Sequence, residues 1–342
     1  MIAITGGGTG GHLAIARVLK NTLNRYGIEP LYIGSTNGQD KNWFEEETGF
    51  AQKYFLDSQG VVNKKGIKKF QSLNNILKSS LTCKEIFKNY KVTKVICVGG
   101  YSAAPASFAT LFSNTKLYIH EQNAAVGKLN KILRPFAKEF FSSYDKKSKV
   151  KDYPVDSIFF QNQREIKELK TIIFLGGSQG SKAINNMAIQ MAPKLAKNGI
   201  KIIHQSGKNE YLKVKKFYQE NNIKADVFDF YPNLIEKLKL ADFAVSRSGA
   251  STLWELTAMG IPSLFIPYPY AAGDHQYYNA KTLSDKNLAL LRREDNLNTN
   301  QIYEDIIKLK LDKISKGLKT EISPDGAEKI IEIILENKGE RL

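Results

Sequence analysis

Residues 1–27, MIAITGGGTGGHLAIARVLKNTLNRYG, hold the pattern that decides the fold. A short apolar run stops at a cluster of glycines. The following residues place Ile15, Leu19 and Leu23 on one face of a helix that ends at Gly27. A strand, a tight loop and an amphipathic helix in this order predict the start of a parallel α/β sheet.

The same order of strand, loop and helix recurs along the chain. Further strands are predicted at residues 31–35, 94–100, 116–123, 171–177, 201–207, 242–249 and 262–268. Apolar runs of four or five residues that alternate with helices are typical of parallel sheets covered on both faces. We therefore expect an α/β protein built from doubly wound sheets.

Length and composition fit two such domains. The chain has 342 residues, 25% charged and 42% hydrophobic, which is ordinary for globular proteins and excludes disorder, collagen and coiled coil. The polar stretch 144–170 lacks a clear strand, so we place the linker there. We predict domains at residues 1–156 and 157–324, with a C-terminal helix at about 325–342 that can pack back on the first domain.

No membrane-spanning or secreted segment is predicted. A glycine-rich loop begins at Gly6, where a signal peptide would need an apolar stretch, and the longest uncharged apolar stretch, 256–272, contains three prolines. Cys83 and Cys97 are too few for a disulfide scaffold and fit a reducing compartment.

The net charge of +16 is unevenly distributed. Residues 1–156 carry +11, and residues 64–94 hold nine lysines with Glu85 as the single acid. A strongly basic chain can bind nucleic acid, an anionic membrane or a phosphorylated substrate, and a solvated basic face is the plainer alternative.

Glycine-rich turns follow strands and open helices at several places. The sequences are GGGTGGH (6–12), GGY (99–101), GGSQGS (176–181) and, more weakly, RSGAS (247–251). Glycine lets the backbone approach a ligand, and the helix that follows directs its N–H groups and positive end at that ligand, which suits phosphate. Such loops in both domains predict a cleft that holds a phosphorylated ligand.

Two similar motifs indicate other enzymes but fit less well. Residues 6–11 match GxGxxG, yet the second strand does not end in the acid that a nicotinamide enzyme needs for the ribose. Residues 176–180 match GxSxG, with Asp274 and His275 downstream as in a hydrolase. A single-domain hydrolase leaves residues 1–160 unexplained.

The sequence gives no reason to expect a metal or another cofactor. A Walker-type loop and an HExxH motif are both absent from it, and its histidines lack the spacing of metal ligands.

The motifs taken together resemble one enzyme family. GGGTGGH, GGYSAAP (99–105), HEQN (120–123), GGSQGS, HQSGK (204–208), SRSGASTLWE (246–255) and HQYYNA (275–280) occur in the order of the MurG family. The resemblance covers residues 2 to about 280. It implies a GT-B fold with two Rossmann-like domains facing a central cleft. It also implies inverting transfer of N-acetylglucosamine (GlcNAc) from UDP-GlcNAc to the C4 hydroxyl of N-acetylmuramic acid (MurNAc) in lipid I, undecaprenyl-pyrophosphoryl-MurNAc-pentapeptide. The product, lipid II, is used for peptidoglycan.

The resemblance also implies a set of donor-binding residues. They are Thr9, Gly10, Gly11, Asn123, Ser178, Tyr231, Ala250, Ser251, Thr252, Leu253, Trp254, Glu255 and Gln276. Ser178 would hold a phosphate, the Tyr231 backbone would meet the uracil, Gln276 would bind the GlcNAc, and Glu255 would accept hydrogen bonds from the ribose. The plainer alternative for Glu255 is an acid that only balances a helix dipole.

On the acceptor side the resemblance implies His12, Tyr101, His120 and Glu121. His12 is the candidate general base, since histidine titrates near neutrality, or a group that positions the acceptor. The alternative is a ring that packs on the glycine loop. For His120 and Glu121 the alternative is a buried pair that supports the site.

The sequence departs from the family pattern at three places. The linker motif GNPVR is replaced by DYPVD (152–156), so Arg247 or Lys182 would supply its charge, or none is needed. LAIA replaces a proline-containing segment after GGH, and of two glutamines only Gln276 remains, preceded by His275.

A lipid acceptor requires contact with a membrane. The resemblance implies a peripheral protein on the cytoplasmic face of the bacterial inner membrane. Residues 66–90 combine lysines with apolar side chains, as a segment that lies on anionic headgroups would. The predicted membrane patch is Ile67, Lys68, Lys69, Phe70, Leu73 and Leu77. The alternative is an ordinary helix that packs on its own domain.

Two other functions fit part of the sequence. A nonhydrolysing UDP-GlcNAc 2-epimerase shares the fold and nucleotide, but the GGGTGGH and HEQN loops argue against it. A nucleic-acid-binding protein would need more aromatic residues among the lysines for base stacking, so we expect no nucleic-acid partner.

Overall fold

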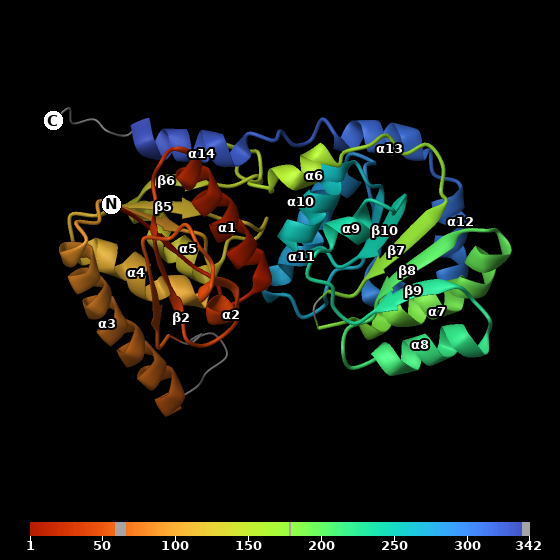
Figure 1. The fold of residues 1–342 in the computed structure, drawn as a ribbon, viewed down its shortest axis with the longest axis horizontal. Coiled ribbons are helices and arrows are strands. Elements are labelled where there is room, and N and C mark those ends of the chain that lie inside the picture. Colours follow the sequence, from red (N-terminus) through yellow and green to blue (C-terminus); the bar gives the residue numbers. More distant parts are fainter. Residues whose placement is uncertain (59–65, 178, 337–342) are drawn as a thin grey trace. The chain divides into compact units, whose positions relative to one another are not determined.

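The structure is a computed structural model that describes residues 1–58, 66–177 and 179–336 (Figure 1). The chain divides into two compact units. Unit 1 comprises Met1–Val155 and Pro324–Leu342, and unit 2 comprises Asp156–Ser323.

Unit 1 is built on a parallel sheet of six strands in the order β3-β2-β1-β4-β5-β6. Its strands are β1 (Ile2–Thr5), β2 (Leu31–Ser35), β3 (Gln52–Leu56), β4 (Lys94–Cys97), β5 (Lys116–His120) and β6 (Ala137–Phe141). Its helices are α1 (Gly10–Arg25), α2 (Asp40–Phe44), α3 (Gly66–Asn89), α4 (Ala104–Ala109), α5 (Lys128–Leu133) and α14 (Gly326–Glu336). Short 3₁₀ turns lie at Tyr101–Ala103 (η1), Thr110–Phe112 (η2) and Arg134–Phe136 (η3).

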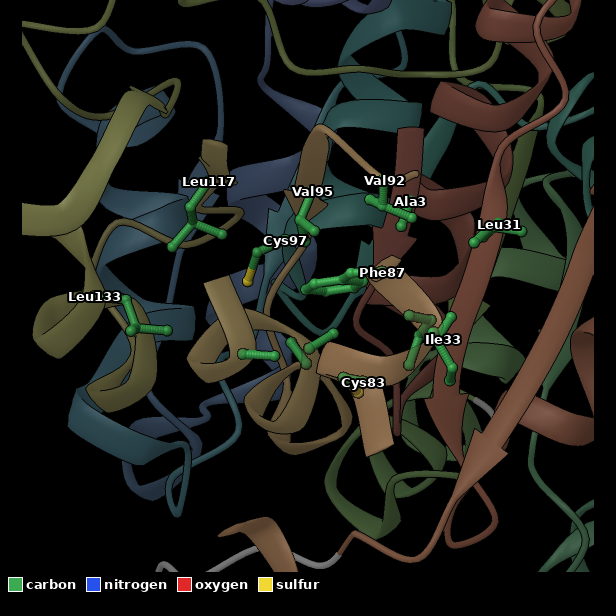
Figure 2. Packing of buried hydrophobic residues seen from close by; sticks show 14 of the residues in the cluster. Ala3, Leu31, Ile33, Cys83, Phe87, Val92, Val95, Cys97, Leu117 and Leu133 are labelled. Carbon is green, nitrogen blue, oxygen red and sulfur yellow. The ribbon is translucent and has the colours of Figure 1, made fainter. Parts of the chain in front are cut away.

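Successive residues of a strand point to opposite faces of the sheet, and in this sheet both faces are buried. On one face Ala3, Ile33 and Val95 pack with residues of α3, α4 and α5, and both cysteines lie in this core (Figure 2). Ile4 and Ile96, at alternating positions, are fully buried as well. This packing explains why the strands read as continuous apolar runs.

Unit 2 repeats the plan with the strand order β12-β11-β10-β7-β8-β9. Its strands are β7 (Thr171–Leu175), β8 (Lys201–Gln205), β9 (Ala225–Phe228), β10 (Phe243–Ser246), β11 (Ser263–Phe265) and β12 (Leu290–Leu291). Its helices are α6 (Ser157–Gln161), α7 (Lys182–Lys197), α8 (Tyr211–Glu220), α9 (Ile235–Leu238), α10 (Ala250–Met259), α11 (His275–Ser284), α12 (Thr299–Ile307) and α13 (Leu311–Leu318). Two 3₁₀ turns lie at Ala272–Asp274 (η4) and Glu294–Asn296 (η5).

The C-terminal helix α14 belongs to unit 1, where it packs against α1. Arg25 forms an ion pair with Glu328 at 3.0 Å, and the Lys94 Nζ donates to the Ile334 carbonyl. The chain therefore leaves unit 1 once and returns to it.

The prediction of an α/β protein with two doubly wound parallel sheets is confirmed. In the part of the chain that the structure describes, no helix is both long and apolar enough to cross a bilayer.

Candidate active site

The glycine-rich loops of both units leave the sheets where the strand order reverses. In unit 1 the chain continues outward in opposite directions from the neighbours β1 and β4, and in unit 2 from β7 and β10. All strands run parallel, so the loops after them gather at one edge of each sheet, and ligands of such sheets bind beside this point.

Asp40 holds the first glycine loop in unit 1. Its buried carboxylate accepts hydrogen bonds from the Gly8 N–H at 2.6 Å, the Ser35 N–H at 3.0 Å and the Tyr32 hydroxyl at 3.0 Å. The Tyr32 hydroxyl lies 3.0 Å from the Gly6 carbonyl oxygen as well. Asp40 therefore holds the first glycine loop against β2. The sequence alone did not indicate this role.

The second glycine loop lies directly against the first. Gly100 has φ of 80°, and a Cβ built there would lie 2.1 Å from the Gly7 carbonyl oxygen. Tyr101 packs its ring against Gly8 and donates a hydrogen bond from its hydroxyl to the Asn37 carbonyl at 2.7 Å. These close approaches require glycine, and they place Tyr101 beside the first glycine loop.

His12 lies in the first turn of α1 and is half-buried. Its Nδ1 is 2.9 Å from the Thr9 Oγ1, and its Nε2 is 2.7 Å from the amide nitrogen of Gln122. Thr9, at the N-cap position, is exposed, and Gly10 and Gly11 open the helix with their N–H groups. Thr9 and His12 are therefore in contact, and Gln122 approaches His12 from the loop after β5.

Glu121 and His120 are buried inside unit 1. The Glu121 carboxylate accepts hydrogen bonds from the N–H groups of Asn123 at 3.0 Å and Gly127 at 2.9 Å, and from the Asn130 side chain at 2.9 Å. His120 is 1% exposed. Burial and, secondarily, the charge of His12 lower the pKa of His120 to about 3. We therefore assign both side chains a supporting role under Asn123 and His12 rather than direct contact with an acceptor.

In unit 2 the loops after β7 and β8 pack backbone to backbone. A Cβ on Gly180 would lie 2.5 Å from the Ser206 carbonyl oxygen, and one on Gly207 would lie 2.5 Å from the Gly180 Cα. Ser181 caps α7 by accepting a hydrogen bond from the Ile184 N–H at 3.3 Å. Ser178, the predicted phosphate ligand, lies outside the described residues.

His204, at the end of β8, has a structural role. Its ring nitrogens lie 3.0 Å from the Asn185 Oδ1 and 3.1 Å from the Tyr218 hydroxyl. Asn185 donates further hydrogen bonds to the Ser206 carbonyl and to Glu210. Burial lowers the pKa of His204 to about 3, which keeps its imidazole neutral.

The loop after β10 opens α10 without a side-chain cap. Gly249 is the N-cap residue and has no side chain to cap the helix, and the N-terminus of a helix favours an anion. Asn279 of α11 donates a hydrogen bond to the Ser248 carbonyl at 3.1 Å. The Ser248 hydroxyl is fully buried and has no hydrogen-bond partner among the described residues. This loop has the chemistry of an anion site.

The predicted nucleotide segment in α10 divides by burial. The side chains of Leu253 and Trp254 are buried. These two residues could therefore contact the sugar nucleotide only through their backbone. Ser251, Thr252 and Glu255 are half-buried. Burial and then the charge of Asp156 raise the pKa of Glu255 to about 7.

The remaining donor residues lie on neighbouring loops of unit 2. The Gln276 side-chain carbonyl accepts a hydrogen bond from the Tyr268 N–H at 2.9 Å. Tyr231 follows β9, and Lys237 Nζ lies 5.0 Å from its ring centroid. Arg247 pairs with Glu294 at 2.7 Å and donates to two backbone carbonyls, which ties it to its own unit.

Lys182 is the other predicted source of positive charge. It is exposed at the first position of α7, beside the GGSQGS loop. Of the two cations considered, Lys182 is therefore the better placed for a diphosphate.

The predicted membrane patch lies on α3 and is only partly described. The side chains of Ile67, Lys68, Lys69, Phe70 and Leu73 lie outside the described residues. Leu77 is 55% exposed, and Leu81, one helical turn later, is 57% exposed. Ile76, an apolar residue of the same segment 66–90, is buried instead, and α3 packs against α4.

Two Rossmann-like units with glycine loops at both switch points define the GT-B fold class. Residues 2–142 match the glycosyltransferase family 28 N-terminal domain, and residues 171–333 match the glycosyltransferase family 28 C-terminal domain. The chain belongs to glycosyltransferase family 28.

Curated relatives match over nearly the whole chain. A protein of Campylobacter jejuni (strain 81-176) is 54% identical over 97% of this chain and 96% of its own. It is named UDP-N-acetylglucosamine–N-acetylmuramyl-(pentapeptide) pyrophosphoryl-undecaprenol N-acetylglucosamine transferase. A protein of the same name from Campylobacter fetus is 51% identical over 98% of this chain and 99% of its own.

A crystal structure of MurG from Acinetobacter baumannii has the same fold. It is 24% identical and covers 98% of this chain and 99% of that chain, with a TM-score of 0.80.

Proposed function

We propose that the protein transfers GlcNAc from UDP-GlcNAc to the C4 hydroxyl of MurNAc in undecaprenyl-pyrophosphoryl-MurNAc-pentapeptide. The observation that carries this proposal is the gathering of the motif residues on the loops at the carboxyl edges of both sheets. Relatives named for this transfer are about half identical to the chain along nearly its full length.

The donor binds to unit 2 in this proposal. The N-terminus of α10 and the GGSQGS loop bind the diphosphate through N–H groups, and Lys182 adds positive charge. Glu255 accepts hydrogen bonds from the two ribose hydroxyls, while the backbone at Tyr231 meets the uracil. Gln276, held by the Tyr268 N–H, meets the GlcNAc.

The acceptor binds to unit 1, beside the two glycine loops. His12 takes the proton of the C4 hydroxyl, and the oxygen attacks the anomeric carbon from the face opposite UDP. The new C–O bond forms as the bond to the β-phosphate oxygen breaks, so the configuration inverts. UDP leaves with the negative charge, which helix N-termini and loop N–H groups stabilise.

The membrane contact is made by α3 and the short turn after α4. Leu77 and Leu81 present apolar side chains, and Lys78, Lys84 and Lys88 are exposed on the same helix. Phe112, in η2 after α4, is 61% exposed, and α3 packs against α4. Apolar side chains next to lysines suit the surface of an anionic bilayer. Here that surface is the cytoplasmic face of the bacterial inner membrane.

The test is incubation of the full chain with radiolabelled UDP-GlcNAc, with and without a lipid I analogue. We expect label in the lipid product and release of UDP, both dependent on the acceptor. Conversion of UDP-GlcNAc to its 2-epimer without acceptor, or donor turnover unaffected by acceptor, would contradict the proposal.

A further inference from the structure

We propose that Gln122 sets the tautomer of His12 and thereby keeps Nε2 ready to accept a proton. This inference rests on the proposed function of His12, and it assigns Gln122 as a positioning residue. Gln122 is buried and lies in the loop after β5, far in sequence from α1.

The direction of the hydrogen bond follows from the donor groups. The amide nitrogen of Gln122 lies 2.7 Å from the His12 Nε2, and an amide nitrogen only donates. The His12 Nε2 must therefore accept, and in a neutral imidazole the proton then resides on Nδ1. That N–H donates to the Thr9 Oγ1 at 2.9 Å.

The orientation of the amide is fixed from its other side. The Tyr153 hydroxyl, in a side chain that is 2% exposed, donates to the Gln122 Oε1 at 3.5 Å. The preceding residue, Glu121, is held by three hydrogen bonds, so the backbone that carries Gln122 is rigid. Both constraints turn the amide nitrogen toward His12.

The Gln122 amide occupies the place that a substrate hydroxyl takes on Nε2. In the free enzyme this neutral amide stabilises the tautomer that has its lone pair on Nε2, and it adds no charge beside the imidazole. When the acceptor binds, the Gln122 side chain rotates away from Nε2 about its own side-chain bonds. The C4 hydroxyl then takes its place and donates in the same direction. The proton then moves from oxygen to Nε2 without a prior tautomer change.

Several other titratable groups lie on the strands and loops that carry the neighbours of His12. They are His120 and Glu121 at the end of β5, Tyr153, Tyr101 and Cys97 beside the second glycine loop, and Asp40 under the first. Burial keeps His120 neutral with a pKa of about 3 and raises the pKa of Cys97 to about 11. Burial also raises the pKa of Glu121, and the hydrogen bonds from Asn123, Gly127 and Asn130 oppose that shift. Because His120 and Cys97 do not change charge near neutral pH, His12 and Glu121 are the neighbours on which a carboxylate introduced at position 122 acts.

The first test reads the tautomer directly by ¹⁵N NMR of the histidine side chains, in the full chain without substrate. Signals of His12 are assigned by their loss in His12→Asn. We expect protonated Nδ1 and unprotonated Nε2 in the wild type, and a tautomer mixture in Gln122→Ala. Tyr153→Phe, which keeps the glutamine, should give a smaller shift in the same direction. A proton on Nε2 in the wild type, or a tautomer unchanged in Gln122→Ala, would overturn the proposal.

The second test uses the pH dependence of transfer. Gln122→Ala should lower kcat about 3- to 10-fold, the effect of one lost hydrogen bond, with the KM for UDP-GlcNAc unchanged. Gln122→Glu puts a negative charge beside the imidazole and should move the acid limb of the kcat profile to higher pH by about one unit. Gln219→Glu, the same change on α8 of unit 2, should leave the profile in place.

The two tests separate this inference from the proposed function. An unmoved profile in Gln122→Glu, or a loss confined to KM in Gln122→Ala, would overturn the positioning role. A wild-type protein without transferase activity would instead contradict the proposed function. The NMR measurement then still decides whether Gln122 sets the tautomer.

Discussion

The carboxylate of Asp156 acts on the carboxyl of Glu255 within unit 2. The burial of Glu255 and, after it, this negative charge raise the pKa of Glu255 to about 7. Asp156 caps α6 by accepting a hydrogen bond from the Ile158 N–H at 3.0 Å, and α6 packs against α10. A residue proposed to bind the donor is therefore held where its own ionisation is unfavourable.

This relationship predicts a pH-dependent gain in stability for Glu255→Gln. The folded chain keeps the Glu255 proton up to about pH 7, whereas the unfolded chain loses it near its ordinary value, pH 4.5. Ionisation of Glu255 therefore lowers the free energy of unfolding as pH rises through this window, and the loss is complete above it. Urea unfolding should show Glu255→Gln more stable than wild type by about 1–3 kcal/mol at pH 8. The gain should vanish at pH 4.

Asp156→Asn is the matched control, because asparagine also caps a helix. Asp156→Asn should remove part of the loss in unfolding free energy that ionisation of Glu255 causes, and it leaves Glu255 itself unchanged. An equal gain for Glu255→Gln at pH 4 and pH 8 would mean that ionisation is not the cause.

Removal of the same carboxylate should weaken donor binding. Glu255→Ala loses hydrogen bonds to two ribose hydroxyls, each worth about 1.5–3 kcal/mol at most for a charged acceptor. We expect a higher KM for UDP-GlcNAc and weaker inhibition by UDP, measured under the same conditions. If both constants match the wild type, Glu255 does not bind the ribose.

His12 should affect the chemical step rather than donor binding. His12→Ala is expected to lower kcat by roughly 10²–10⁴, the usual contribution of a general base. The Kd for UDP-GlcNAc, measured by calorimetry, should stay near the wild-type value, since unit 2 binds the donor in our proposal. A defect seen in KM alone would make His12 a binding residue.

The membrane contact should depend on both apolar and basic side chains of α3. The double variant Leu77→Ser, Leu81→Ser and the triple variant Lys78→Gln, Lys84→Gln, Lys88→Gln should each weaken binding to anionic vesicles. The effect of the lysines should be about tenfold or more, since each contributes about 1 kcal/mol near such a surface. Sedimentation with vesicles, at low and high salt, measures both effects.

Leu212→Ser provides the control for this surface. Leu212 is 79% exposed but lies on α8 of unit 2, so its loss should leave vesicle binding unchanged. Transfer to a long-chain acceptor should slow in the α3 variants, while transfer to a short soluble acceptor should not. Equal slowing with both acceptors would place the membrane surface elsewhere.

The central strands could be predicted from sequence, whereas several edge strands could not. β1, β4 and β7 are buried on both faces, so they read as apolar runs that end in glycine. β3 and β9 lie at the edges of their sheets and contain half-exposed and charged residues, which hides them in a hydropathy pattern.

The site was predictable where it rests on local motifs and not where it depends on distant contacts. Glycine loops and the residues next to them are visible in the sequence. Asp40 reaches Gly8 from 32 residues away, and Gln122 reaches His12 from 110 residues away, so no local signal marks either role. Ile76 shows the converse, since its apolar character fits a membrane stripe and a core equally well, and only the packing of α3 decides.

The linkage in the product distinguishes this transfer from every other reaction of UDP-GlcNAc. The proposed single displacement by the C4 hydroxyl predicts that NMR of the purified disaccharide product shows GlcNAc joined to C4 of MurNAc in the β configuration. Its formation should require both UDP-GlcNAc and the lipid acceptor. An α-linked product, attachment at another hydroxyl, or no disaccharide at all from competent substrates would contradict the account.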